Sequence, residues 1–244
     1  MKDVSNELIE LTKDFNTKIE SIRVLIKDDI YIYNPLNYAS LMFEAYIKEY
    51  VTSPTKYLFL GMNPGPFGMA QTGIPFGEVN AVKNYLKLDY PISSPGDEHP
   101  NRKVEGLNIK RSEISGLRLW DLIETHFKDP KDMRGKIYIA NYCPLLFLSP
   151  VKTAKNITPD KLSKETRALL YETCDKYLFD TIDLLKCEKL IGIGKFAQQK
   201  LKNDKIPYYS ILHPSPASPL ANKGWKEKTE QKLIEIGVLN ENDC

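Results

Sequence analysis

The chain has 244 residues, of which 42% are hydrophobic, which is enough for one globular domain with a well-buried core. Its 34 lysines and arginines are nearly balanced by 32 aspartates and glutamates, which excludes a chain that binds nucleic acid through its overall charge. Any affinity for nucleic acid must therefore come from a local basic surface.

Helical patterns and short apolar runs follow one another along the chain. Apolar residues recur at helical spacing over 4–26 and 38–50, which predicts two N-terminal helices. Short β-type runs predict strands at 57–61, 137–143, 189–194 and 207–212. Further helical patterns cover 79–87, 114–126, 163–186, 195–202 and 226–236. The alternation predicts a single α/β domain over residues 1–244, with a central parallel sheet of about four strands flanked by helices on both faces.

The stretches without a clear pattern are expected to be irregular; they are 62–77, 89–113, 144–160 and 213–223. Three of the four directly follow a predicted strand. Because open α/β sheets bind ligands beyond the carboxyl ends of their strands, we expect these loops to share one rim. Within the second stretch, residues 93–106 (SSPGDEHPNRKVEG) are the best candidate for a mobile insertion.

The first of these loops is unusually rich in glycine and proline, and it reads GMNPGPFGMAQTGIPFGE over residues 61–78. It contains neither GxxxxGK[ST] nor GxGxxG, and its prolines remove backbone N–H donors that a phosphate cradle needs. A nucleotide cofactor is therefore not expected. Such a loop suits a rigid pocket wall that approaches a flat ligand closely, with the Phe76 ring against the face of that ligand.

Two further motifs follow predicted strands. HPSPASPLANKGW, residues 213–225, begins with one of the three histidines of the chain, and NYCPLLF places Asn141 at the end of another strand. Taken singly, Asn63 and Asn141 are ordinary turn residues, His213 is an ordinary structural histidine and Phe76 an ordinary core residue. The interpretation therefore depends on the motifs as a set.

Together with SEISGLRLW at 112–120, these motifs closely resemble the single-strand-selective monofunctional uracil-DNA glycosylases, a branch of the uracil-DNA glycosylase superfamily. The resemblance runs from about residue 57 to residue 226. It implies hydrolysis of the N-glycosidic bond of uracil in DNA, with 5-hydroxymethyluracil as a further base, in base excision repair. It implies no metal and no cofactor. Because no lysine lies in the matched motifs near the sugar, water should be the nucleophile and lyase activity should be absent.

The resemblance also assigns roles to individual residues. Asn63 orients the attacking water, and a neutral His213 donates a hydrogen bond to a uracil oxygen as negative charge develops there. Asn141 reads the base, accepting from N3–H and donating to O4, while Phe76 stacks on the extruded ring. Room at position 5 of the ring is left by Met62, Gly65 and Met69.

The loop after His213 is expected to contact DNA. Its contacting residues are Pro214, Ser215, Ala217, Ser218 and Leu220, with Lys223 toward a phosphate. The family commonly carries an arginine-containing wedge after HPSP, where this chain has Ala217, Ser218, Pro219 and Leu220. Because small side chains cannot fill the gap that an extruded base leaves, the sequence predicts a preference for single-stranded over double-stranded DNA.

Two alternatives stay open at this stage. One is a glycosylase of the same fold with a wider range that includes deaminated purines such as hypoxanthine and xanthine. The other is a non-catalytic module that binds single-stranded DNA. We expect a monomer, located at the nucleoid in the cytoplasm of a bacterium, or in the nucleus if the source is a eukaryote.

The cysteines and the N-terminal residues indicate the cellular compartment in which the protein is expected. The four cysteines are far apart and form no CxxC or CxxH pair, which argues against a zinc site and predicts reduced thiols. The N-terminal residues carry a charge every few positions, and no apolar run approaches the length that spans a membrane. We therefore expect a soluble intracellular protein without a membrane segment.

Overall fold

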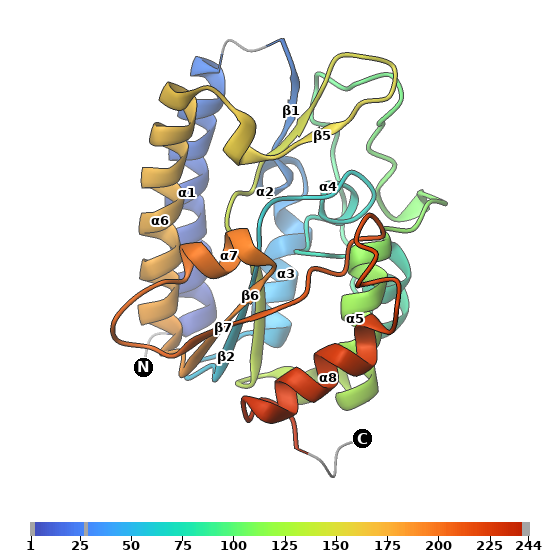
Figure 1. Ribbon diagram of the computed structural model, residues 1–244. Coiled ribbons are helices and arrows are strands. Elements are labelled where there is room, and N and C mark those ends of the chain that lie inside the picture. Colours follow the sequence, from blue (N-terminus) through green and yellow to red (C-terminus); the bar gives the residue numbers. More distant parts are fainter. Residues whose placement is uncertain (1–2, 27–28, 241–244) are drawn as a thin grey trace.

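The computed structural model describes residues 3–26 and 29–240 (Figure 1). Its α-helices are α1 (Val4–Leu25), α2 (Pro35–Tyr38), α3 (Ser40–Tyr50), α4 (Met69–Thr72), α5 (Ile114–His126), α6 (Lys164–Leu185), α7 (Lys195–Lys200) and α8 (Trp225–Glu235). Its strands are β1 (Tyr31–Tyr33), β2 (Tyr57–Gly61), β3 (Ile137–Asn141), β4 (Leu146–Leu148), β5 (Asn156–Ile157), β6 (Lys189–Ile193) and β7 (Tyr208–Ile211). A π-helical turn covers Ala81–Tyr85, and 3₁₀ turns cover Gly106–Asn108, Pro130–Met133 and Pro159–Lys161.

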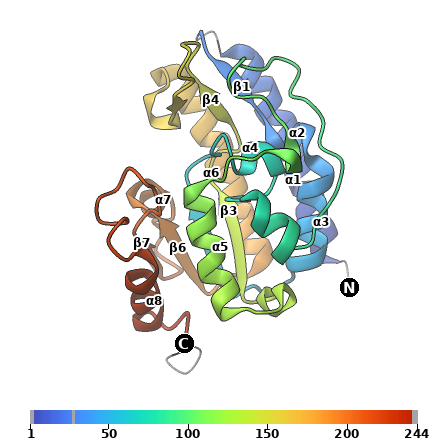
Figure 2. The ribbon, with the colours of Figure 1, turned by 90° about the vertical axis from the view of Figure 1, so that its right-hand side faces the viewer.

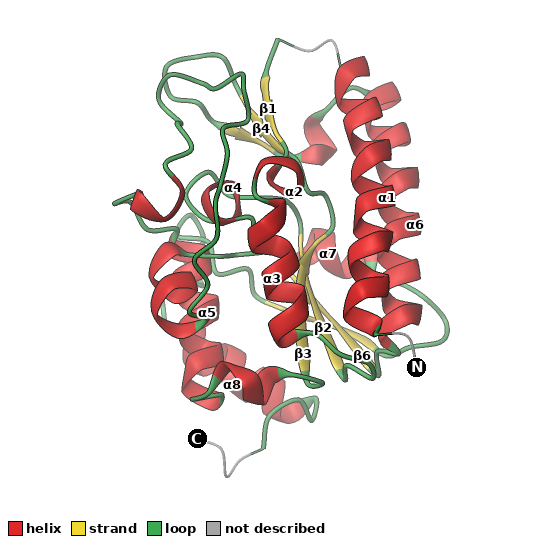
Figure 3. Cartoon of the chain, turned by 180° about the vertical axis from the view of Figure 1, so that it is seen from behind, coloured by secondary structure: helices red, strands yellow, loops and turns green. Residues whose placement is uncertain are grey.

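The centre of the fold is a four-stranded parallel sheet in the order β3-β2-β6-β7, with helices on both faces (Figures 2 and 3). Leu58, Phe59 and Leu60 of β2 are fully buried, as expected for a strand that is covered on both sides. The predicted fold class is confirmed. The boundaries of the four predicted strands agree with the structure to within two residues.

The N-terminal helix belongs to this core. Helix α1 lies beside the long helix α6 (Figures 1 and 3), and the Phe15 ring stacks on Tyr177 with centroids 4.1 Å apart. Leu8 and Ile19 of α1 are fully buried. Asp3 caps the helix by accepting the Ser5 N–H at 3.1 Å, which satisfies one of the free amides of the first turn. The apolar residues whose spacing predicted this helix therefore form its buried face.

The prediction that 144–160 is irregular is wrong in part, because β4 and β5 lie within that stretch. They join β1 in a second, antiparallel sheet in the order β1-β4-β5. Strand β1 and helix α2 also lie between the two predicted N-terminal helices. Strands of two or three residues are too short to show a period of two, and every residue of β4 is buried, so no alternation marks it.

Two other predicted segments differ from expectation in detail. The helix predicted over 79–87 is a π-helical turn, Ala81–Tyr85. The predicted insertion at 93–106 is tied to the small sheet, since the Tyr33 hydroxyl donates to Arg102 O at 2.7 Å and accepts the His99 N–H at 2.8 Å. His99 itself is buried.

The cysteines follow the prediction as far as the structure describes them. Cys143, Cys174 and Cys187 are buried free thiols. Cys244 lies outside the described residues. Burial raises the pKa of the Cys187 thiol to about 12, so that thiol stays protonated at neutral pH.

Candidate active site

A cavity of about 500 Å³ lies at the carboxyl ends of the central strands. Loops that follow β2, β3 and β7 form most of its wall, as predicted from their positions after strands. Eight residues predicted from the sequence line this one cavity: Met62, Asn63, Gly65, Met69, Phe76, Asn141, His213 and Ser215. Residues up to 153 positions apart in the chain are thus brought together.

Asn141 lines the cavity at a place that the sheet register fixes. It is the last residue of β3 and lies directly opposite Gly61, the last residue of β2. Its Nδ2 donates to the Met69 sulfur at 3.2 Å. Its Oδ1 is buried and has no hydrogen-bond partner among the described residues. An unpaired buried acceptor costs about 1–3 kcal/mol, so this atom is placed for a donor that arrives with a ligand.

Phe76 forms a side wall beside Asn141. Its backbone has a φ of +56°, a left-handed conformation that costs a non-glycine residue of order 1–3 kcal/mol. Its ring lies against Gly61, where a Cβ would come within 2.7 Å of Cζ. The ring centroid is 6.2 Å from that of His213. The ring thus lines the same cavity as Asn141 and His213.

Asn63 is fixed through its amide nitrogen. Nδ2 donates to Leu145 O and to Asn156 Oδ1, both at 3.4 Å. Asn156 in turn donates to Pro64 O at 3.1 Å, so the two asparagines brace the turn after β2. Because the nitrogen is engaged, the Asn63 Oδ1 is the atom left to accept a hydrogen bond from a water or a ligand.

His213 begins the loop after β7, and neighbouring helices hold that loop in place. Trp225 at the start of α8 donates its indole N–H to Leu212 O at 2.7 Å. Arg118 of α5 donates to Pro214 O at 3.1 Å and to Asn222 Oδ1 at 2.8 Å. Burial lowers the pKa of His213, which favours the neutral imidazole at physiological pH.

The rest of the predicted DNA-contacting loop lies outside the cavity. Pro214 is buried beside His213, while Ala217 and Lys223 are exposed. Ser218 donates its backbone N–H to Ser215 O at 3.0 Å, which tightens the turn. The Leu220 side chain is 63% exposed, and no fold contact accounts for so large an apolar side chain at the surface. The loop thus presents an exposed apolar side chain four residues beyond Pro216, which lines the cavity.

Six lining residues were not predicted; they are Pro66, Glu113, Ser115, Asn156, Thr158 and Pro216. Glu113 and Ser115 lie in the SEISGLRLW stretch that the sequence singled out without assigning roles. Gly116 in the same stretch has no room for a side chain, because a Cβ there would overlap the Phe76 carbonyl. This glycine lets the start of α5 pack directly on the Phe76 backbone and brings Glu113 and Ser115 to the cavity.

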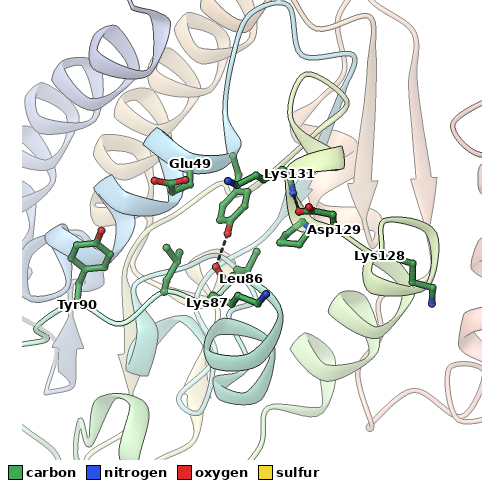
Figure 4. A pocket seen from close by; sticks show the side chains of 10 residues that line it. Glu49, Leu86, Lys87, Tyr90, Lys128, Asp129 and Lys131 are labelled. Carbon is green, nitrogen blue, oxygen red and sulfur yellow. Dashed lines mark hydrogen bonds between the residues drawn. The ribbon is translucent and has the colours of Figure 1, made fainter.

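A second cavity, of about 480 Å³, contains none of the predicted residues (Figure 4). It is lined by residues that precede β2 and β3, including Glu49, Lys87 and Asp129, so it lies at the amino ends of the strands. In the described part of the chain, no group of three or more His, Cys, Asp or Glu side chains is arranged to hold a metal ion. No described helix is long and apolar enough to cross a membrane.

Comparison with known proteins agrees with this geometry. Residues 48–235 match the family model described as "Uracil DNA glycosylase superfamily". The chain belongs to this superfamily. It is 42% identical over 214 residues to the single-strand selective monofunctional uracil-DNA glycosylase of Rattus norvegicus, covering 85% of this chain and 76% of the relative. The corresponding proteins of Mus musculus and Bos taurus are each 41% identical over the same share of this chain, with 76% and 78% of the relatives covered.

These identities place the chain in the single-strand selective monofunctional uracil-DNA glycosylase family, which confirms the resemblance inferred from the motifs. The fold is also that of a solved structure, SMUG2 of Pedobacter heparinus. The two superpose with a TM-score of 0.70 over 97% of this chain and 99% of that one, at 20% sequence identity.

Proposed function

We propose that this protein is a monofunctional DNA glycosylase that hydrolyses the N-glycosidic bond of uracil in DNA, with a preference for single strands. The observation that carries the proposal is the buried Oδ1 of Asn141 in the cavity lining, which has no hydrogen-bond partner among the described residues. Uracil presents an N3–H donor that satisfies this acceptor, whereas cytosine presents a lone pair at the same position. Mispaired buried polar groups cost about 1–3 kcal/mol each, so the site discriminates against cytosine.

The reaction follows from the other wall residues. The extruded uracil stacks on Phe76, and the N-glycosidic bond lengthens as the sugar becomes oxocarbenium-like and charge spreads onto the base. The neutral His213 donates a hydrogen bond to the uracil oxygen where that charge collects. The Asn63 Oδ1 orients the water that adds to the sugar. An amide is too weak a base to take the proton early, so stabilisation of the leaving uracil supplies most of the catalysis.

The loop after His213 accounts for the strand preference. Leu220 is the bulky apolar side chain of the loop, and Ala217 and Ser218 are too small to fill the gap left by a flipped base. Extrusion from a duplex costs a few kcal/mol that single strands do not incur. Lys223 is exposed at the far end of the loop and is proposed to meet a phosphate.

The cellular setting follows as part of the proposal. The protein acts as a monomer in base excision repair, at the nucleoid of a bacterium or in the nucleus if the source is a eukaryote. It leaves an abasic site and free base for later enzymes.

The proposal is tested with single-stranded oligonucleotides that carry one uracil, hypoxanthine, xanthine or cytosine each. After incubation, hot alkali cleaves the strand wherever a base has been lost. We expect strand cleavage with uracil and none with cytosine. Faster cleavage with hypoxanthine or xanthine than with uracil would indicate the wider-range glycosylase. Tight binding to the oligonucleotide with no cleavage after prolonged incubation would indicate a binding module and overturn the proposal.

A further inference from the structure

The cavity wall contains a carboxyl group for which the reaction described above has no role. Glu113 is the residue before α5, and its side chain lies along the turn after β2. A Cβ on Gly65 would come within 2.6 Å of the Glu113 Cδ and 2.7 Å of Oε1. A Cβ on Gly68 would come within 3.0 Å of the Glu113 Cγ. The carboxyl group therefore occupies the place that a side chain at position 65 would take.

One oxygen of this carboxyl group is engaged and the other is not. Oε2 accepts the Phe67 N–H at 3.1 Å, while Oε1 has no hydrogen bond to any described residue. Burial raises the pKa of Glu113, and the nearby Arg111, whose guanidinium lies 4.1 Å from the centroid of the Phe67 ring, opposes that shift. A partly desolvated carboxyl with one free oxygen is therefore held rigidly in the wall.

We infer that Glu113 is a specificity residue that reads the substituent at position 5 of the extruded base through its free carboxylate oxygen. The inference rests on the proposed function, in which Gly65 faces position 5 of uracil. A 5-hydroxymethyl group donates its O–H to the carboxylate, forming a charge-assisted hydrogen bond. A 5-formyl group has only acceptors to offer and meets another acceptor. A 5-methyl group, as in thymine, covers the carboxylate without a compensating bond.

The inference is tested by single-turnover excision from single strands that carry uracil, 5-hydroxymethyluracil or 5-formyluracil. Each rate is divided by the uracil rate of the same variant, so losses of folded enzyme cancel. In Glu113→Gln the amide oxygen can still accept the Phe67 N–H. The amide nitrogen takes the place of the free carboxylate oxygen, so a donor replaces an acceptor at that position. We expect the 5-hydroxymethyluracil ratio to fall about fivefold, because the charge-assisted hydrogen bond to the carboxylate is replaced by a neutral one that the amide nitrogen donates to the hydroxyl oxygen. The 5-formyluracil ratio should rise by a similar factor.

Two further variants complete the test. Glu113→Ala removes the acceptor without adding a donor, so it should lower the 5-hydroxymethyluracil ratio and raise the 5-formyluracil ratio by less than Glu113→Gln does. Glu49→Gln is the matched control, an exposed carboxylate that lines the distant cavity (Figure 4), and it should change neither ratio.

The outcomes separate this inference from the proposed function. Unchanged ratios in both Glu113 variants would overturn the inference and leave Glu113 as a support for the Phe67 backbone, even if uracil excision falls. Wild-type protein that releases no uracil at all would instead overturn the proposed function.

Discussion

Gly61 offers the most demanding test of the site geometry, because it lies against both Asn141 and Phe76, the two residues proposed to contact the base. In Gly61→Ala the new Cβ would lie 2.7 Å from Phe76 Cζ, and it would be closer still to Phe76 Cε2 and to Asn141 Oδ1. Ordinary contact begins at 3.4 Å, so the ring and the amide must each move by about 0.7 Å or more. Misplacement of a binding group by about 1 Å can cost about 100-fold in rate.

We therefore expect Gly61→Ala to excise uracil from single strands about 100-fold more slowly under single-turnover conditions. The added methyl group does not itself enter the reaction, so the loss must come from the displaced side chains. Gly96→Ala is the control, because a Cβ there meets nothing within 4 Å. Its positive φ makes it mildly destabilising, but its excision rate should be unchanged. A Gly61→Ala rate within threefold of wild type, with thermal unfolding showing a folded protein, would refute the proposed placement of Asn141 and Phe76.

Three further expectations concern the loop after β7. Arg118→Ala removes the two hydrogen bonds that Arg118 donates to this loop, and should slow single-strand excision about tenfold; an unchanged rate would show that the loop positions His213 without them. Leu220→Ala should slow excision from G·U duplexes several-fold more than from single strands, and equal losses on both would contradict a gap-filling role. Because the folded pKa of His213 is lowered below 6.5, the unfolded chain binds more protons below that pH, and the free energy of unfolding falls as the pH falls. In His213→Asn, denaturant titrations from pH 8 to pH 5 should show a shallower fall of the free energy of unfolding than in wild type. If the two proteins lose stability in parallel, the pKa of His213 is not lowered in the folded state.

Much of the fold was predictable because its elements are long or continuously apolar. YLFLG reads as a buried strand because all of it except Tyr57 is buried between covering helices. The small sheet was not predictable, since β5 has two residues and β1 and β4 have three each, too few to establish a period. Its place in the fold depends on pairing between segments more than 100 residues apart, such as Tyr31 with Leu148.

The lining of the cavity was predictable for residues that lie inside a recognisable motif, and it was missed for residues that reach the cavity through tertiary packing. Asn141 ends a strand, Asn63 and His213 each come two residues after one, and the parallel topology brings such positions to one rim. Glu113 reaches the cavity only because α5 packs on the Phe76 backbone at Gly116, a contact that no local pattern encodes. A charged residue within SEISGLRLW was the available signal for it.

The central claim, that Asn63 and His213 act on a uracil bound in this cavity, is tested most directly by single-turnover excision of uracil from single-stranded DNA. Asn63→Ala and His213→Ala are compared with wild type at enzyme concentrations that saturate the substrate. Each variant should be slower by a factor of roughly 10² to 10³, the typical loss when one preorganised polar group is removed, with little change in thermal stability. A rate within a few fold of wild type for either variant would contradict the role given to that residue.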